Sequence, residues 1–184
     1  MNYYENALKV NEEHRVILSN IHVQEIESYL EAIMKADKVF FIGVGRVMLA
    51  LETMAKRLTH LGINTSVVGA INEPPIGPSD LLVVGSGSGE SLIPKQIASC
   101  AKRYEAQVAH LTSNSQSSIA KMSDVVVNFH CGSKIGGGVF ESIQPMSTLF
   151  EQSLMIFGDL VCLELMKRKG LSFEQVSKNH ANLE

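Results

Sequence analysis

The sequence of 184 residues predicts an α/β fold, a five-stranded parallel sheet that is doubly wound with helices on both faces. Short apolar runs rich in Val, Ile, Leu and Phe alternate along the chain with segments of helical periodicity, which is the pattern of a parallel sheet with helical crossovers. Continuous Val, Ile, Leu and Phe runs within the strand-like segments are expected of strands buried on both faces. Hydrophobic residues make up 45% of the chain, enough to bury a core of this kind.

The first half of the chain predicts two helices followed by three strands. A helix connects the first and second strands, and a loop connects the second and third. In the second helix Ile26, Leu30 and Ile33 recur at helical spacing. Gly62 is expected to end the helix that follows the first strand. The expected elements are helices over 3–19 and 23–36, a strand over 38–43, a helix over 46–62, a strand over 64–69, a proline-rich loop over 70–79 and a strand over 80–85.

The second half continues the alternation and closes with a long apolar helix. Ser172 is a candidate N-cap for a last short helix before the tail HANLE. The expected elements are a helix over 91–104, a strand over 106–112, a short helix over 115–122, a strand over 124–130, a glycine-rich loop over 131–145 and a helix over 146–170. The length suits one domain over 1–184, with residues 1–36 as N-terminal helices and 171–184 as a C-terminal helix and tail.

Charge and composition argue against several classes of partner. The formal net charge is -3 and the basic residues are scattered, so neither nucleic acid nor a membrane surface is an expected partner. No apolar run approaches the length of a transmembrane helix, and residues 1–14 hold no apolar signal core. We therefore expect a cytoplasmic protein. The absence of a Cys-x-x-Cys motif and of paired histidine spacing predicts reduced thiols and no metal site; the cysteines are Cys100, Cys131 and Cys162.

The segment GSGSGES directly follows the third predicted strand and opens a predicted helix. Glycines let the backbone approach a ligand closely, and a helix N-terminus adds N–H groups and a positive dipole end. No Gly-Lys-Ser/Thr ends the loop and the spacing is not Gly-x-Gly-x-x-Gly, so a phosphate monoester fits better than a nucleotide. A tight turn without a ligand is the alternative. The candidate phosphate-binding residues are Ser86, Gly87, Ser88, Gly89 and Ser91.

Two further loops follow strands at the same predicted edge of the sheet. GVGR (43–46) follows the first strand, and Gly45 and Arg46 could contact phosphate or sugar oxygens, although a plain surface arginine is equally compatible. TSNSQSS (112–118) follows the fourth strand, and an ordinary polar turn with an N-cap explains it better than a site.

Six motifs together resemble the SIS (sugar isomerase) domain family, in particular its 6-phospho-3-hexuloisomerase branch. They are GSGSGES, GVGR, LTHLG, IAKMSDVVV, QPMSTLFEQ and HANLE, and the resemblance covers nearly the whole chain. It implies a flavodoxin-like strand order of 2-1-3-4-5, a homotetramer, and interconversion of 3-hexulose 6-phosphate and fructose 6-phosphate without a metal or organic cofactor. It also implies phosphate-binding roles for Ser86, Ser88 and Ser91.

The resemblance assigns the catalytic roles to Glu151 and His180. Glu151 would be the base, since one carboxylate can remove and return the proton that moves between adjacent carbons. His180 would shuttle the ring-opening proton, and so close to the end of the chain we expect it to serve a neighbouring subunit. The family's first loop usually reads Gly-x-Gly-Arg-Ser, whereas this chain has Val47 in place of the serine, which predicts either weaker binding of phosphate or a different substrate.

Other candidates remain open or are assigned structural roles. Glu141 in the glycine-rich loop is the rival base, more plausible as a surface charge; His60 and His110 are expected to be structural, and Asp159 and Glu164 to face solvent or an interface. Two alternative functions remain as well: an isomerase for another substrate, such as arabinose 5-phosphate, and a non-catalytic sugar-phosphate-binding module.

Overall fold

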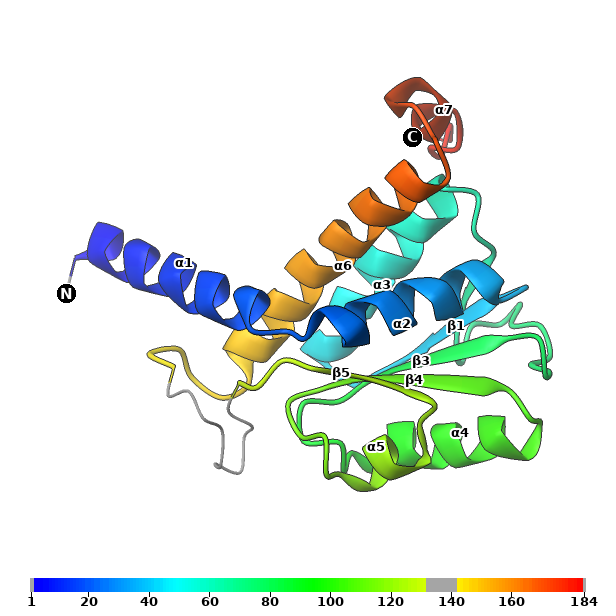
Figure 1. The fold of residues 1–184 in the computed structure, drawn as a ribbon, viewed down its shortest axis with the longest axis horizontal. Coiled ribbons are helices and arrows are strands. Elements are labelled where there is room, and N and C mark those ends of the chain that lie inside the picture. Colours follow the sequence, from blue (N-terminus) through cyan, green and yellow to red (C-terminus); the bar gives the residue numbers. More distant parts are fainter. Residues whose placement is uncertain (1, 132–141, 184) are drawn as a thin grey trace.

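The computed structural model describes residues 2–131 and 142–183, and in them the chain forms one parallel sheet with helices on both faces (Figure 1). The strand order is β2-β1-β3-β4-β5, and every neighbouring pair is parallel. The predicted fold class and strand order are therefore confirmed. Glu141 and most of the glycine-rich loop lie outside the described residues.

Each predicted helix and strand is present, with ends that differ by a few residues at most. In chain order the elements are α1 (Tyr3–Ser19), α2 (Val23–Lys35), β1 (Val39–Ile42), α3 (Arg46–His60), β2 (Thr65–Val67), β3 (Leu81–Gly85), α4 (Leu92–Arg103), β4 (Gln107–Thr112), α5 (Ser118–Met122), β5 (Val125–Asn128), α6 (Thr148–Arg168) and α7 (Phe173–Lys178).

Alternate side chains of the strands supply two separate apolar cores. Phe41 of β1 and Val83 of β3 point into the core shared with α2, α3 and α6. Phe40 and Val84, their neighbours in sequence, point into the smaller core shared with α4 and α5. Figure 1 shows these two groups of helices on opposite faces of the sheet. Burial on both faces explains why β1 and β3 are apolar throughout.

The terminal helices lie at the edges of this body. Figure 1 shows the first half of α1 extending away from the sheet, while its second half meets the beginning of α6. At the other end of α6, Ser172 caps α7 in a reciprocal capping box with Gln175, so the predicted N-cap is confirmed. No helix in the described ranges combines the length and the apolar character needed to cross a bilayer. Cys100, Cys131 and Cys162 are free thiols, as expected.

The strand order creates one switch point, between β1 and β3. The chain leaves β1 toward β2 on one side, whereas β3 leads to β4 and β5 on the other. Loops after β1 and β3 therefore diverge and leave a crevice beyond the carboxyl ends of these strands, which is where open α/β sheets bind ligands.

Candidate active site

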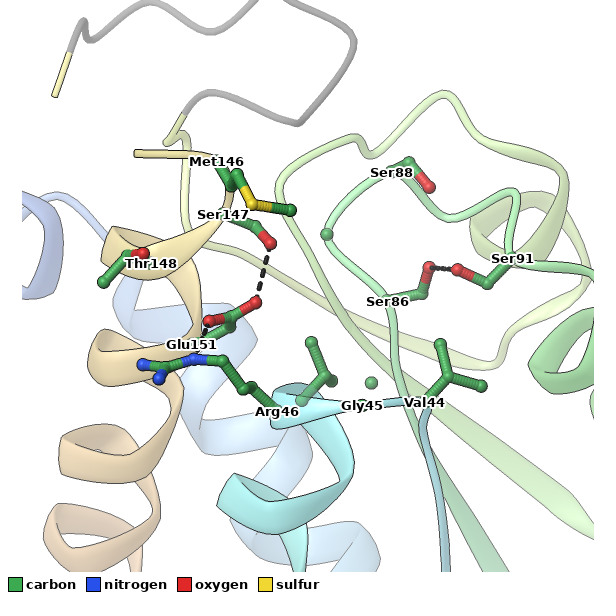
Figure 2. Close-up of a pocket in the computed structure, with 13 residues that line it drawn as sticks. Val44, Gly45, Arg46, Ser86, Ser88, Ser91, Met146, Ser147, Thr148 and Glu151 are labelled. Carbon is green, nitrogen blue, oxygen red and sulfur yellow. Dashed lines mark hydrogen bonds and ion pairs between the residues drawn. The ribbon is translucent and has the colours of Figure 1, made fainter. Parts of the chain in front are cut away.

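A pocket of about 600 Å³ occupies this crevice, a size suited to a small ligand. The loops after β1 and β3 form two of its walls, and the start of α6 forms the third (Figure 2). Seven of the nine predicted site residues line it; the exceptions are Gly89 and His180. The lining residues are Val44, Gly45, Arg46, Val47, Gly85, Ser86, Gly87, Ser88, Ser91, Met146, Ser147, Thr148 and Glu151.

The serine hydroxyls hold the loop after β3 in a closed turn. Ser86 Oγ accepts a hydrogen bond from the Gly89 N–H at 3.1 Å and lies 3.0 Å from Ser91 Oγ. Ser88 Oγ accepts one from the Glu90 N–H at 3.3 Å. Ser91 is the N-cap of α4, but its hydroxyl is turned to Ser86 and makes no capping bond. The hydroxyls of Ser86 and Ser91 thus lie together at the positive end of the α4 dipole.

Two glycines of this loop are required by close contacts. A Cβ at Gly87 would lie 3.2 Å from the Phe150 ring, so the loop touches α6 one residue before Glu151. Gly89 has a φ of +67°, and a Cβ there would lie 2.0 Å from Ser117 Oγ. Gly89 therefore lies on the side of the loop that packs against Ser117, outside the pocket, and lets the loop make this close contact.

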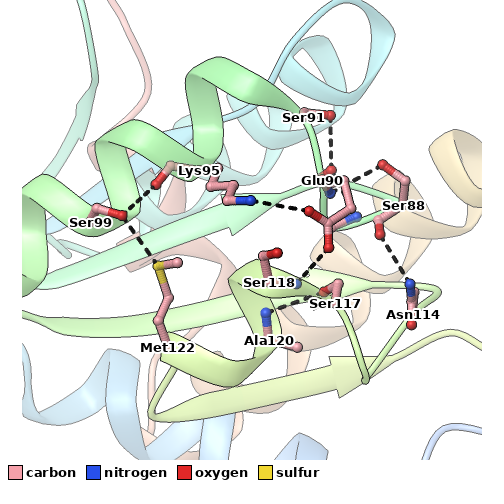
Figure 3. A network of polar contacts seen from close by, with 12 residues as sticks. Ser88, Glu90, Ser91, Lys95, Ser99, Asn114, Ser117, Ser118, Ala120 and Met122 are labelled. Carbon is pink, nitrogen blue, oxygen red and sulfur yellow. Dashed lines mark hydrogen bonds and ion pairs between the residues drawn. The ribbon is translucent and has the colours of Figure 1, made fainter.

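The segment after β4 braces the loop from behind (Figure 3). The Glu90 carboxylate accepts a hydrogen bond from the Ser118 N–H at 2.7 Å, and this bond is the main reason that the pKa of Glu90 is lowered. Asn114 Nδ2 donates to the Ser88 carbonyl at 3.3 Å. Ser117 caps α5 through a bond from the Ala120 N–H. The interpretation of residues 112–118 as a polar turn with an N-cap is confirmed, and this turn also supports the candidate phosphate loop.

His110 lies beneath the same loop and is fully buried. Its Nδ1 lies 3.0 Å from the Val84 carbonyl, so Nδ1 carries the proton and donates it. Its Nε2 has no hydrogen-bond partner among the described residues. Burial lowers the pKa of His110 to about 4. The expected structural role fits a neutral ring packed behind the loop.

Glu151 lies in the first turn of α6 and is only 8% exposed. Arg46 Nε donates to its Oε2 at 2.5 Å, and Ser147 Oγ donates to its Oε1 at 2.7 Å. Figure 2 shows both partners beside the carboxylate, with the serine loop on the opposite side of the hollow. A buried carboxylate needs such partners, because an unpaired charge is costly to bury.

Sequence reasoning missed Ser147 and the partner of Arg46. Ser147 is the N-cap of α6, but its hydroxyl makes no capping bond and turns to Glu151. The available signal was the spacing in the STLFE segment. The glutamate follows the serine by four residues, whereas a capping box would place it three residues after the serine, so the segment does not fit a capping box. Arg46, a candidate contact for phosphate or sugar oxygens, pairs with Glu151.

An apolar side chain, that of Val47, stands where the family pattern has a serine hydroxyl after Arg46. Val47 is 8% exposed, and its Cγ1 would lie 2.8 Å from a Cβ at Gly85. Val47 therefore fills the notch at the base of the serine loop. Val44 and Met146 extend this apolar lining.

His180 lies away from the pocket of its own chain. Its ring packs against His60 with centroids 5.1 Å apart, and Asn179 Nδ2 donates to the His60 carbonyl at 2.9 Å. His60 ends α3, whereas the pocket lies at the opposite end of that helix. The expectation that His180 serves a neighbouring subunit stays a prediction. Asp159 and Glu164 lie on the surface of this chain, where they pair with Arg57 and Lys167.

Comparison with known proteins agrees with this architecture. The SIS domain family matches residues 32–156, which include the sheet and the start of α6. A crystal structure of a Methanococcus jannaschii protein, with an inferred molecular function of 3-hexulose-6-phosphate isomerase, is 29% identical, has a TM-score of 0.86, and overlaps 98% of this chain and 99% of that one.

Curated relatives extend the similarity beyond the fold. The 3-hexulose-6-phosphate isomerase of Bacillus subtilis is 40% identical over 162 residues, 88% of each chain. That of Mycobacterium gastri is 32% identical over 179 residues, covering 97% of this chain and 90% of the relative. The resemblance inferred from the motifs is confirmed: this chain belongs to the SIS domain family, within the group that contains these isomerases.

Proposed function

We propose that this chain interconverts 3-hexulose 6-phosphate and fructose 6-phosphate. One observation carries the proposal: a buried carboxylate, Glu151, lies across a single pocket from a serine-glycine loop at a helix N-terminus. The loop offers hydroxyls and a helix dipole to a phosphate dianion, and the carboxylate offers a base to the carbon chain. The names of the relatives supply the substrate class.

The phosphate binds at the loop in this proposal. Ser86 and Ser91 turn from their mutual hydrogen bond to the phosphate oxygens, and Ser88 turns from the Glu90 N–H, with Gly87 letting the backbone approach. Gly89 keeps the turn closed from behind. The sugar then extends from the loop toward Arg46 and Glu151 along the hollow in Figure 2.

Glu151 moves the proton between neighbouring carbons. In the forward direction its carboxylate removes the proton from C2 of the 3-ketose, the electrons of that C–H bond form a C2–C3 double bond, and the C3 carbonyl oxygen becomes the oxyanion of a 2,3-enediolate. The carboxylic acid returns the proton to C3 while the O2 proton passes to O3, which leaves the carbonyl at C2. Arg46 and Ser147, which hold the carboxylate, fix the orientation of its two oxygens.

We further propose a cytoplasmic homotetramer in which the tail of one chain reaches the pocket of another. Exposed apolar side chains on α6 support self-association; they are Met155, Ile156, Leu160 and Leu163. His180 then provides the ring-opening proton in trans. Light scattering coupled to size-exclusion chromatography measures the assembly directly, and a monomer at catalytic concentrations would contradict this part of the proposal.

Glu151→Gln tests the proposed chemistry. Conversion of 3-hexulose 6-phosphate to fructose 6-phosphate should fall by at least about a hundredfold in this variant, because general-base catalysis contributes that much or more. Glu164→Gln, a change at a half-buried residue of the same helix outside the pocket, should keep wild-type turnover. Wild-type rates in Glu151→Gln would exclude Glu151 as the base.

A panel of phosphosugars decides between the proposed substrate and its alternatives. Val47 lines the pocket where the family pattern has a serine. This difference favours testing another substrate, and also a module that only binds sugar phosphate. Faster turnover of arabinose 5-phosphate would change the substrate, and binding without any turnover would replace the enzyme by a sensor.

A further inference from the structure

We propose that Glu13 and His14 of α1 are positioning residues for Glu151. The inference rests on the proposed function, in which Glu151 is the base, and it gives the N-terminal helix a part in catalysis. The two residues form hydrogen bonds with segments before and after Glu151, although neither lines the pocket.

Glu13 holds the segment that leads into α6. Its side chain is buried, with the residue only 5% exposed, and its carboxylate accepts three hydrogen bonds. The donors are Ser142 Oγ at 2.8 Å, the Ile143 N–H at 2.7 Å and Gln144 Nε2 at 3.0 Å. This carboxylate therefore organises the residues just before Met146 and Ser147, which line the pocket. Charge-assisted bonds of this kind are about twice as strong as neutral ones.

His14 holds α6 just after Glu151. Its Nε2 lies 3.0 Å from Gln152 Oε1 and its Nδ1 lies 2.9 Å from Ser153 Oγ. Since an amide oxygen only accepts, Nε2 carries a proton, and in the neutral ring Nδ1 accepts from the Ser153 hydroxyl. Ser153 is fully buried, so this bond fixes the rotation of the first turns of α6.

The two contacts are complementary because of helix geometry. Consecutive residues of a helix point about 100° apart, so Glu13 reaches the incoming segment while His14 reaches α6 itself. Figure 1 shows α1 meeting α6 where α6 begins. A carboxylate base must be held within about 0.5 Å of its productive position, and a displacement of about 1 Å can cost a hundredfold in rate.

Glu13→Gln tests the inference, with Glu12→Gln as its matched control. The glutamine keeps the size of the side chain but presents an NH₂ group to donors, so the grip on 142–144 loosens. We expect kcat for 3-hexulose 6-phosphate to fall about tenfold or more with KM within about twofold, since the phosphate loop is untouched. Glu12 is exposed and pairs with Arg15, so its variant should match the wild type.

An isotope effect separates positioning from a loss of folded enzyme. Substrate deuterated at C2 should show a larger isotope effect on kcat in Glu13→Gln, because proton removal becomes slower than the other steps. A smaller folded fraction would lower kcat and leave this ratio unchanged. His14→Phe, which keeps the ring and removes both hydrogen bonds, should behave in the same way as Glu13→Gln.

The outcomes distinguish this inference from the proposed function. A folded Glu13→Gln variant with wild-type kcat and isotope effect overturns the positioning role while the isomerase stands. Absence of turnover by the wild type overturns the proposed function instead. If Glu13→Gln does not fold, Gln144→Ala carries the test, because it removes one of the three bonds at a half-buried residue. Unchanged kinetics there would overturn the role of Glu13.

Discussion

At the scale of single residues, replacing Val47 should strengthen the binding of sugar phosphate and lower the stability of the fold. Its side chain lies beside Gly85 in the pocket lining, where a serine hydroxyl would face the proposed phosphate site. Val47→Ser should lower the Kd for fructose 6-phosphate about tenfold, since a hydrogen bond to a charged group contributes about 1.5–3 kcal/mol. It should also lower Tm by a few degrees, because buried methyl groups are lost. Calorimetry and thermal unfolding measure the two effects.

Val44→Thr is the control for this change. Val44 also lines the pocket but is 42% exposed, so it can gain a hydroxyl with little loss of packing. Its affinity for fructose 6-phosphate should stay close to that of the wild type. Equal tightening in both variants would mean that added polarity, and not the position of Val47, determines the affinity.

The sequence predicted single site residues better than it predicted their partners. The serines were suggested by residue type and local spacing and Glu151 by the family resemblance, and these residues line the same pocket. The pairing of Arg46 with Glu151 joins residues 105 positions apart, and no local pattern encodes it. Ser147 was missed because an N-cap serine ordinarily bonds to its own helix.

At the scale of elements, the loop from Ser86 to Ser91 depends on the turn behind it. Gly89→Ala should raise KM for the sugar phosphate by about tenfold or more, because the new methyl group meets Ser117 at 2.0 Å and the loop must move. Steady-state kinetics measures the change. The glycine spacing predicted a tight turn. The hydrogen bonds from Asn114 and Ser118 to this loop could not be predicted, because they depend on the pairing of β3 with β4.

Gly170→Ala is the matched control for the loop. Gly170 has a φ of +61°, similar to that of Gly89, but a Cβ there would meet nothing within 4 Å. This variant should lose about 1 kcal/mol of stability through backbone strain and keep the wild-type KM. If Gly170→Ala raised KM as much as Gly89→Ala, general destabilisation would explain both.

At the scale of the whole molecule, the sequence predicted the sheet and its order but not how the ends of the chain contact the site. The alternation of apolar runs and helical segments carries the fold, because the central strands bury side chains on both faces of the sheet. The contacts of Glu13 and His14 with α6 and the segment before it span more than 125 residues, and no periodicity indicates them. The proposed role of His180 in a neighbouring subunit would depend on surfaces of more than one chain, which no local pattern encodes.

The stability of the whole molecule should depend on pH through His110. Its pKa is about 4 in the folded chain, whereas an unperturbed histidine of the unfolded chain has a pKa of 6.5, so between these values the unfolded chain binds a proton that the folded chain does not. The free energy of unfolding should therefore fall as pH drops from about 6.5 to about 4, by about 3 kcal/mol from this residue, and His110 should add nothing further below about pH 4.

His110→Leu isolates that contribution, since leucine fills a similar volume and cannot titrate. Urea unfolding at a fixed protein concentration gives the free energy at each pH, and fixing the concentration removes the effect of assembly. The variant should be less stable at about pH 7, where the bond to the Val84 carbonyl is lost, but its free energy should fall less steeply toward about pH 4. Since other carboxylates and histidines titrate equally in both proteins, the difference between the two curves reports His110 alone. Parallel curves between about pH 6.5 and 4 would show that the buried ring accepts its proton without opposing the fold.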